Sequence, residues 1–179
     1  TANFNGLRVG ERAVFTDAVF TATVDFGAAS IGTDLNMIGA RFANTGSQAN
    51  FNSLRVGSVA LFDKAVFAGP VDLGFMMIGN QLSLDDAEFA AAGESISLNS
   101  IEVASSVFFQ RAVVTASIDL GYASVGRNLY LNDTRFTTPD SDLSLSGARI
   151  GDSLFVRRID ASGGVDISFA NITGNLEAT

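Results

Sequence analysis

The chain has 179 residues, of which 47% are apolar and 17% are charged, and its formal net charge is −8. This composition is typical of a folded domain with a sizeable core, and the negative charge disfavours direct binding to nucleic acid. The sequence has no cysteine and no histidine, which excludes disulfides, thiolate nucleophiles and zinc sites built on these ligands. No apolar run approaches the ~18 residues that span a bilayer, so we expect no transmembrane segment.

An internal repeat organises the chain from its first residues. The octapeptides NFNGLRVG (3–10) and NFNSLRVG (50–57) differ at one position and begin 47 residues apart. Within this unit a valine or isoleucine, usually followed by glycine, recurs with a sequence spacing that alternates between 22 and 25. These positions are Val9, Ile31, Val56, Ile78, Val103, Val125, Ile150 and Ile172. The sequence therefore predicts a repeat protein whose unit is itself double, with a short step followed by a long one.

Apolar and polar residues alternate with a period of two inside each step. In chain order, the segments 24–26 (VDF), 35–37 (LNM), 40–42 (ARF) and 54–56 (LRV) each place one polar residue between two apolar ones. This alternation predicts half-buried strands of about three residues, four in each step. No segment has the i, i+3, i+4, i+7 pattern of an amphipathic helix over three turns.

Four short strands in every step, whether short or long, predict an all-β fold, a parallel β-helix or solenoid of seven to eight coils. With coils about 4.8 Å apart, the rod would be on the order of 35 Å long. Equivalent residues should stack inside it, in two columns that read Phe4, Phe26, Phe51, Leu73, Leu98, Leu120, Leu145, Ile167 and Phe20, Phe42, Phe67, Phe89, Val114, Phe136. We expect residues 1–179 to form a single domain and, because the chain starts at Thr1 and not at methionine, to be a fragment of a longer protein.

Six short stretches carry a resemblance to a known family. They are ANFNG (2–6), VDFGA (24–28), ANFNS (49–53), VDLGF (71–75), IDLGY (118–122) and VDISF (165–169). In these stretches the chain resembles the bacterial pentapeptide-repeat proteins, whose consensus is roughly A-(D/N)-(L/F)-x-x. The resemblance implies a right-handed quadrilateral β-solenoid. We expect a soluble bacterial protein that is cytoplasmic or peripheral to a membrane and not secreted. The coils of this chain are longer than four pentapeptides, so its corners should be longer too.

Two columns of outward residues include large apolar side chains. The first reads Val14, Asn36, Leu61, Ser83, Phe108, Tyr130, Phe155, Glu177, and the second, at a corner, reads Ala28, Phe75, Tyr122, Phe169. Exposed apolar patches often mark contacts with a partner, so Leu61, Phe108, Tyr130, Phe155, Phe75, Tyr122 and Phe169 form the candidate interaction surface. The alternative is that these side chains only support pairing between strands.

Two further columns carry charge. The corner column Lys64, Asp86, Arg111, Asp133, Arg158 alternates in sign and predicts a ladder of ion pairs between coils, or else a docking strip. The column Asp25, Asn50, Asp72, Ser97, Asp119, Ser144, Asp166 places a carboxylate on every second coil. This spacing keeps like charges apart; alternatively it forms an acidic face, as in the pentapeptide-repeat proteins that mimic DNA and bind type II topoisomerases.

The sequence contains no catalytic constellation that we recognise. Without histidine or cysteine the usual general base and nucleophile are missing, and no phosphate-binding glycine motif is present. The extra residues of the long coils fall in loops 43–48, 90–95 and 137–142, which lie along one edge. Inserted loops of repeat proteins often bind a partner, but the composition of these three favours small solvated turns. We therefore expect no enzyme activity, no catalytic residues, no cofactor and no metal site.

The sequence thus predicts a non-enzymatic β-solenoid that serves as a scaffold or protein-binding rod. The expected partner is another protein or a second copy of the chain, and neither direct nucleic-acid binding nor a small-molecule ligand is expected. Two alternatives remain: an acidic DNA mimic that binds a type II topoisomerase, and a subunit of an end-to-end or side-by-side oligomer or filament.

Overall fold

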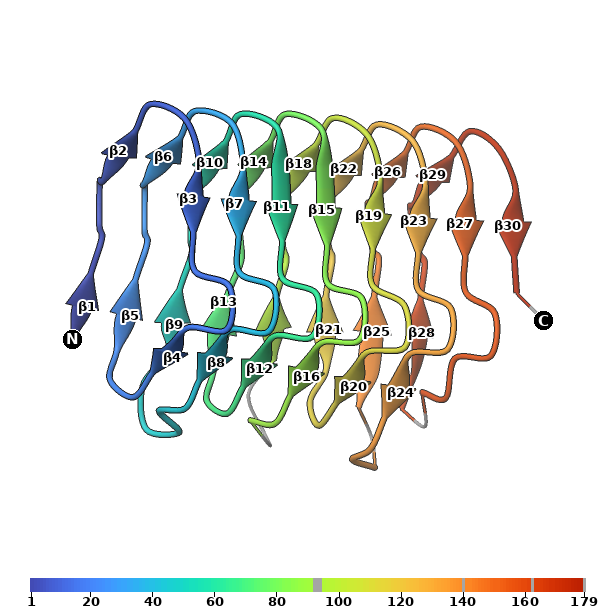
Figure 1. Cartoon of the computed structure of the whole chain (residues 1–179). Helices are drawn as coiled ribbons and strands as arrows, with labels where there is room; N and C mark the ends of the chain where they lie inside the picture. Colours follow the sequence, from blue (N-terminus) through green and yellow to red (C-terminus); the bar gives the residue numbers. More distant parts are fainter. Residues whose placement is uncertain (92–94, 140, 162, 179) are drawn as a thin grey trace.

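The computed structural model describes residues 1–91, 95–139, 141–161 and 163–178. Within these ranges the chain has no helix and forms four parallel sheets, here called A to D, to which successive strands contribute in turn. The chain winds right-handed into a straight rod of about eight coils, with its N- and C-termini at opposite ends (Figure 1). The prediction of an all-β solenoid with four strands per coil is confirmed.

Sheet A contains β1 (Ala2–Asn3), β5 (Val24–Asp25), β9 (Ala49–Asn50), β13 (Val71–Asp72), β17 (Ile96–Ser97), β21 (Ile118–Asp119), β25 (Asp142–Ser144) and β28 (Gly164–Asp166). Sheet B contains β2 (Arg8–Val9), β6 (Ser30–Ile31), β10 (Arg55–Val56), β14 (Met77–Ile78), β18 (Glu102–Val103), β22 (Ser124–Val125), β26 (Arg149–Ile150) and β29 (Asn171–Ile172).

Sheet C contains β3 (Ala13–Val14), β7 (Leu35–Asn36), β11 (Val59–Leu61), β15 (Gln81–Ser83), β19 (Val107–Phe108), β23 (Leu129–Tyr130), β27 (Leu154–Phe155) and β30 (Leu176–Glu177). Sheet D contains β4 (Val19–Phe20), β8 (Arg41–Phe42), β12 (Val66–Phe67), β16 (Glu88–Phe89), β20 (Val113–Val114) and β24 (Arg135–Phe136).

Most strands are two residues long and not three as the alternation predicts, because the flanking residues already turn into the corners. The strands nevertheless pair in the register that the repeat predicts. Asn3 pairs with Asp25, and Asp25 pairs with Asn50, so that a residue meets its equivalent in the next coil across both the short and the long step. The repeat in the sequence is therefore the register of the sheets.

The core contains both predicted inward columns, together with the buried apolar residues of sheets B and C. Phe26 stacks on Phe4 and Phe51 with ring centroids 4.4 and 5.4 Å apart, and Phe67 stacks on Phe42 and Phe89 at 4.7 and 5.0 Å. Such offset stacking adds about 0.5–1.5 kcal/mol per pair to the burial of the rings. Burial is incomplete only in the terminal coils, where a neighbouring coil is present on one side alone; there Phe4 and Phe20 are half-buried and Ile167 is exposed.

Two of the four corners hold one residue per coil in the left-handed backbone conformation. At the corner between sheets A and B these residues are Gly6, Ala28, Ser53, Phe75, Ser100, Tyr122, Gly147 and Phe169. At the corner between sheets C and D they are Asp17, Gly39, Lys64, Asp86, Arg111, Asp133 and Arg158. Only three of these fifteen residues are glycine, although L-residues with side chains pay about 1–2 kcal/mol for this conformation.

The three loops of the long coils lie on one edge of the rod, between sheets D and A. Loop 43–48 joins β8 to β9, and the other two occupy the same place in later coils. Residues 92–94 of loop 90–95 and residue 140 of loop 137–142 lie outside the described residues. The predicted position of the inserted residues is confirmed. No helix long and apolar enough to cross a membrane occurs among the described residues.

Candidate protein-binding surfaces

The first candidate surface is a strip of aromatic side chains on the outer face of sheet C. Phe108 pairs in register with Tyr130, and Tyr130 with Phe155. Their rings stack with centroids 5.0 and 4.7 Å apart and planes inclined by 13° and 9°. All three side chains are half-buried, so the strip is less exposed than the sequence predicts, because each ring covers the face of the next.

Both ends of this strip are closed by polar residues. At the C-terminal end the guanidinium of Arg157 lies 6.0 Å from the ring centroid of Phe155 and forms an ion pair with Glu177. At the other end comes Ser83, which is buried and donates a hydrogen bond to Asp63. Leu61 lies beyond Ser83 in the same column and is half-buried. The structure therefore separates Leu61 from the aromatic strip.

The second candidate surface, which we call the ridge, follows the corner between sheets A and B. It consists of Phe75, Tyr122 and Phe169, whose side chains are 53%, 67% and 92% exposed. Their backbones have φ values of 56°, 55° and 56°. No ring pair among the described residues involves any of the three, so both faces of each ring lack an aromatic neighbour.

The spacing of the ridge explains why its rings do not stack. They occur on every second coil, about 9–10 Å apart, and the two coils between them carry Ser100 and Gly147 at the same corner. The ring of Tyr122 leans over the last of these: a Cβ atom on Gly147 would lie 2.8 Å from Cδ1 of Tyr122. Bulky residues are rare in the left-handed region, and here they gain little packing in return.

The strip and the ridge do not meet. In each coil the chain passes from the corner that holds the ridge, through a strand of sheet B and a further corner, before it reaches sheet C (Figure 1). Six of the seven predicted interaction residues thus belong to two separate surfaces, and Leu61 belongs to neither. One is packed within its sheet and the other is exposed.

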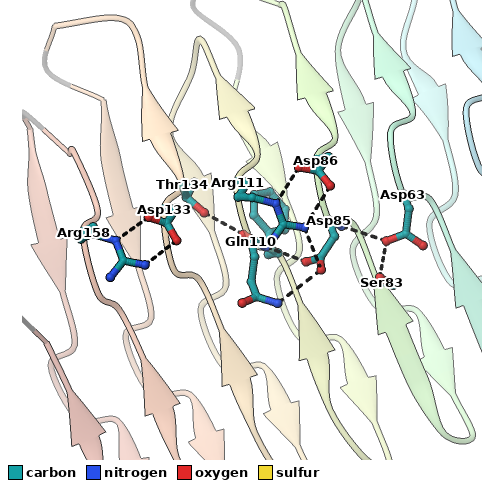
Figure 2. Close-up of polar contacts among 10 residues, drawn as sticks. Asp63, Ser83, Asp85, Asp86, Gln110, Arg111, Asp133, Thr134 and Arg158 are labelled. Atoms are coloured by element: carbon teal, nitrogen blue, oxygen red, sulfur yellow. Dashed lines mark hydrogen bonds and ion pairs between the residues drawn. The ribbon is translucent and has the colours of Figure 1, made fainter.

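The charged column lies at the corner between sheets C and D and forms two separate ion pairs (Figure 2). Arg111 donates to both oxygens of Asp86 at 2.7 and 2.9 Å, and Arg158 donates to both oxygens of Asp133 at 2.6 and 2.7 Å. Lys64 has no ion pair among the described residues. The predicted ladder is therefore interrupted between Arg111 and Asp133, with each arginine bound to the coil before it.

Neighbouring carboxylates at this corner differ in their protonation behaviour. The hydrogen bonds from Arg111 hold the pKa of Asp86 below its usual value. Burial raises the pKa of Asp85, although the backbone amide of Gln110 donates to its Oδ1 at 2.8 Å and Arg111 is nearby. Figure 2 shows that these groups form hydrogen bonds and ion pairs with one another between adjacent coils.

The aspartate column of sheet A has a structural role that the sequence reading missed. Asp25, Asp72 and Asp119 each accept a hydrogen bond at 2.8 Å from the backbone amide two residues later, at the start of the corner. Asparagines of adjacent coils add to this, as when the Nδ2 of Asn50 donates to Asp25 at 2.8 Å. The signal was available, since Asp and Asn commonly cap turns through the amide at i+2.

Other kinds of site find no support among the described residues. No group of three or more acidic, cysteine or histidine side chains there is arranged to hold a metal ion. Comparison with protein-family models and with the sequences of curated proteins gives no match to this chain. The surfaces of the rod, considered on their own chemistry, are therefore the basis for a functional proposal.

Proposed function

We propose that the chain is a non-enzymatic scaffold that binds a partner protein along the ridge. The observation that carries this proposal is the exposure of Phe75, Tyr122 and Phe169 in left-handed backbone conformations. Backbone strain without compensating contacts within the chain is found most often at functional sites. Aromatic side chains are also the residues that contribute most to protein–protein interfaces.

The form of the ridge suits an extended protein partner. Its rings stand about 9–10 Å apart with small residues between them, so apolar side chains of a partner would fit beside Tyr122 and over Ser100. A partner segment in β conformation advances about 3.3 Å per residue, so about three of its residues would span the distance from one ring to the next. This arrangement would bind a segment lying along the rod.

We also propose that the chain is a divergent solenoid of the pentapeptide-repeat type and has no catalytic activity. The four parallel sheets and the two-residue strands suit that type of coil. The lack of histidine and cysteine suits a binding role. The acidic DNA-mimic alternative receives less support, because its aspartates accept hydrogen bonds from corner amides and neighbouring asparagines.

The ridge is tested by the triple variant Phe75→Ser, Tyr122→Ser, Phe169→Ser in a quantitative affinity capture from lysate of the source organism. Serine already occupies this corner at Ser53 and Ser100 with the same backbone conformation, so the variant should fold. We expect the proteins captured by the wild-type chain to be lost.

The matched control is Val14→Ser with Val19→Ser, which removes two exposed apolar side chains from other faces of the rod. This variant should capture the same proteins as the wild type. If the ridge variant also retains every captured protein, the ridge is not the binding surface and the proposal fails.

A further inference from the structure

A shallow open groove of about 580 Å³ runs along the outer face of sheet B. It crosses five successive coils and does not include the ridge or the strip. The outward side chains that line it are Ser30, Arg55, Met77, Glu102 and Ser124. In the sheet these residues pair in this order, each with its neighbour in the next coil.

The wall of the groove is formed by backbone. Gly32, Gly57, Gly79 and Gly126 follow the strands of sheet B and line the groove beside the outward column. Close stacking of coils favours glycine here, because a Cβ atom on Gly57 would lie 2.0 Å from the carbonyl oxygen of Gly32. This stretch of sheet B is therefore smooth apart from its outward column of side chains and the methyl group of Ala104.

The outward column is antisymmetric in charge about Met77. One coil before it lies Arg55 and one coil after it lies Glu102, while the next positions on each side are both serine. Both charged side chains are exposed, and neither has an ion-pair partner within the part of the chain described. Two coils separate them by about 9–10 Å, and the 39% exposed side chain of Met77 lies between them.

We propose that this face binds the same face of a second copy of the chain, with the two rods antiparallel and a two-fold axis passing across Met77. This operation places Arg55 opposite Glu102 of the partner subunit, and repeats the contact on the other side of the axis. A two-fold interface requires such self-complementarity. The two methionines meet at the centre, where flexible thioether side chains adapt well to each other.

The ends of the same column oppose the contact. Arg8 and Arg149 lie three coils from Met77 on opposite sides, so the two-fold operation brings Arg8 towards Arg149 of the partner subunit. This like-charge pair at the rim weakens the dimer and limits it to a weak, salt-dependent association. It also provides a position where one substitution strengthens the dimer.

The experiment is sedimentation equilibrium of the full chain over a wide concentration range at low ionic strength. We expect the wild type to dimerise, and Arg55→Glu or Glu102→Arg alone to weaken the dimer about tenfold or more, because each creates two like-charge pairs. An equal mixture of these two variants should form a heterodimer, because both contacts then join opposite charges. Arg149→Glu should tighten the dimer by roughly threefold to tenfold.

Circular dichroism of each variant provides the control for folding. Because the substituted side chains are exposed, the spectrum of each variant should match that of the wild type. A wild type that stays monomeric at every concentration overturns the proposal. A dimer that both single charge reversals leave intact, or a mixture that does not restore association, overturns it as well. The proposal does not depend on the ridge, and the triple ridge variant described above should dimerise like the wild type.

Discussion

The strip and the ridge contain the same kind of side chain but differ in how the fold uses it. Phe108, Tyr130 and Phe155 occur in consecutive coils and bury their ring faces against one another. The aromatic residues of the ridge occur in alternate coils and have no ring partner among the described residues. In a solenoid, the spacing along the rod decides whether an outward aromatic residue stabilises the sheet or remains available to a partner.

This comparison gives a physical criterion for reading surface columns in repeat proteins. A column filled in every coil places neighbouring rings within about 5 Å, the distance at which they stack. A column filled in every second coil doubles that distance and prevents stacking. An exposed large side chain in a column filled in every second coil is therefore the stronger indication of a binding surface.

The largest expected effect is on stability and separates the two surfaces directly. Tyr130→Ala removes two stacked pairs and should lower the free energy of unfolding by about 1–3 kcal/mol. Tyr122→Ala removes an exposed ring and should change it by less than about 0.5 kcal/mol. Urea denaturation of both variants checks this, and equal losses would show that the ridge is as well packed as the strip.

A substitution that relieves backbone strain at the ridge should have a smaller effect, and it should increase the free energy of unfolding. Asparagine tolerates the left-handed conformation better than phenylalanine does, so Phe75→Asn should raise the free energy of unfolding by up to about 1 kcal/mol. The same change at Phe108, which is not among the left-handed residues, should be destabilising. Thermal unfolding of the pair measures this, and a clear loss of stability in Phe75→Asn would contradict the assignment of strain.

The smallest effects are expected at the corner between sheets C and D. There, charged side chains form ion pairs between adjacent coils, just as the rings of the strip stack between adjacent coils. Asp86 has a pKa below its ordinary value of 3.8, so its ionised form stabilises the fold above that pH and the contribution is lost as the pH falls through the lower folded pKa. Asp85 has a raised pKa, so its ionisation opposes folding as the pH rises through the interval above 3.8.

We therefore expect Asp86→Asn to lower the free energy of unfolding at neutral pH and Asp85→Asn to raise it, each by less than about 1 kcal/mol because the groups are exposed or half-exposed. Both differences from the wild type should vanish at a pH below the folded pKa of Asp86. Chemical denaturation at several pH values tests this. A pH-independent difference would mean that packing, and not ionisation, is responsible.

The sequence predicts the columns of this molecule well, because stacking coils repeat their chemistry at a fixed distance along the chain. The alternation of short and long steps identifies Phe26 and Phe67 as core residues and places the loops on one edge. The exposure of each outward column was harder to predict. The burial of Tyr130 depends on how its ring tilts between two neighbours, and residue order alone does not contain that angle.

The corners were predicted least well. Propensity would place glycine or asparagine in a left-handed position, whereas the chain places Phe75 and Tyr122 there, so local preference gives no warning of the ridge. The capping role of Asp25 was likewise hidden behind its regular spacing, which also suits a reading in terms of charge repulsion. At Phe75 and Tyr122 the tertiary requirement of a square coil outweighs the local preference, whereas at Asp25 the local preference for capping a turn is followed.

The alternation of short and long coils has a consequence for how such a rod can change in length. Ridge and inserted loops each recur once in two coils, so they keep a constant phase relative to each other along the axis. Adding or removing a pair of coils preserves that phase, whereas adding or removing a single coil breaks the alternation; removing a short coil, for example, would place two long loops next to each other. The repeating unit of this architecture is therefore the 47-residue pair of coils, and related rods of different length should differ by whole pairs of coils.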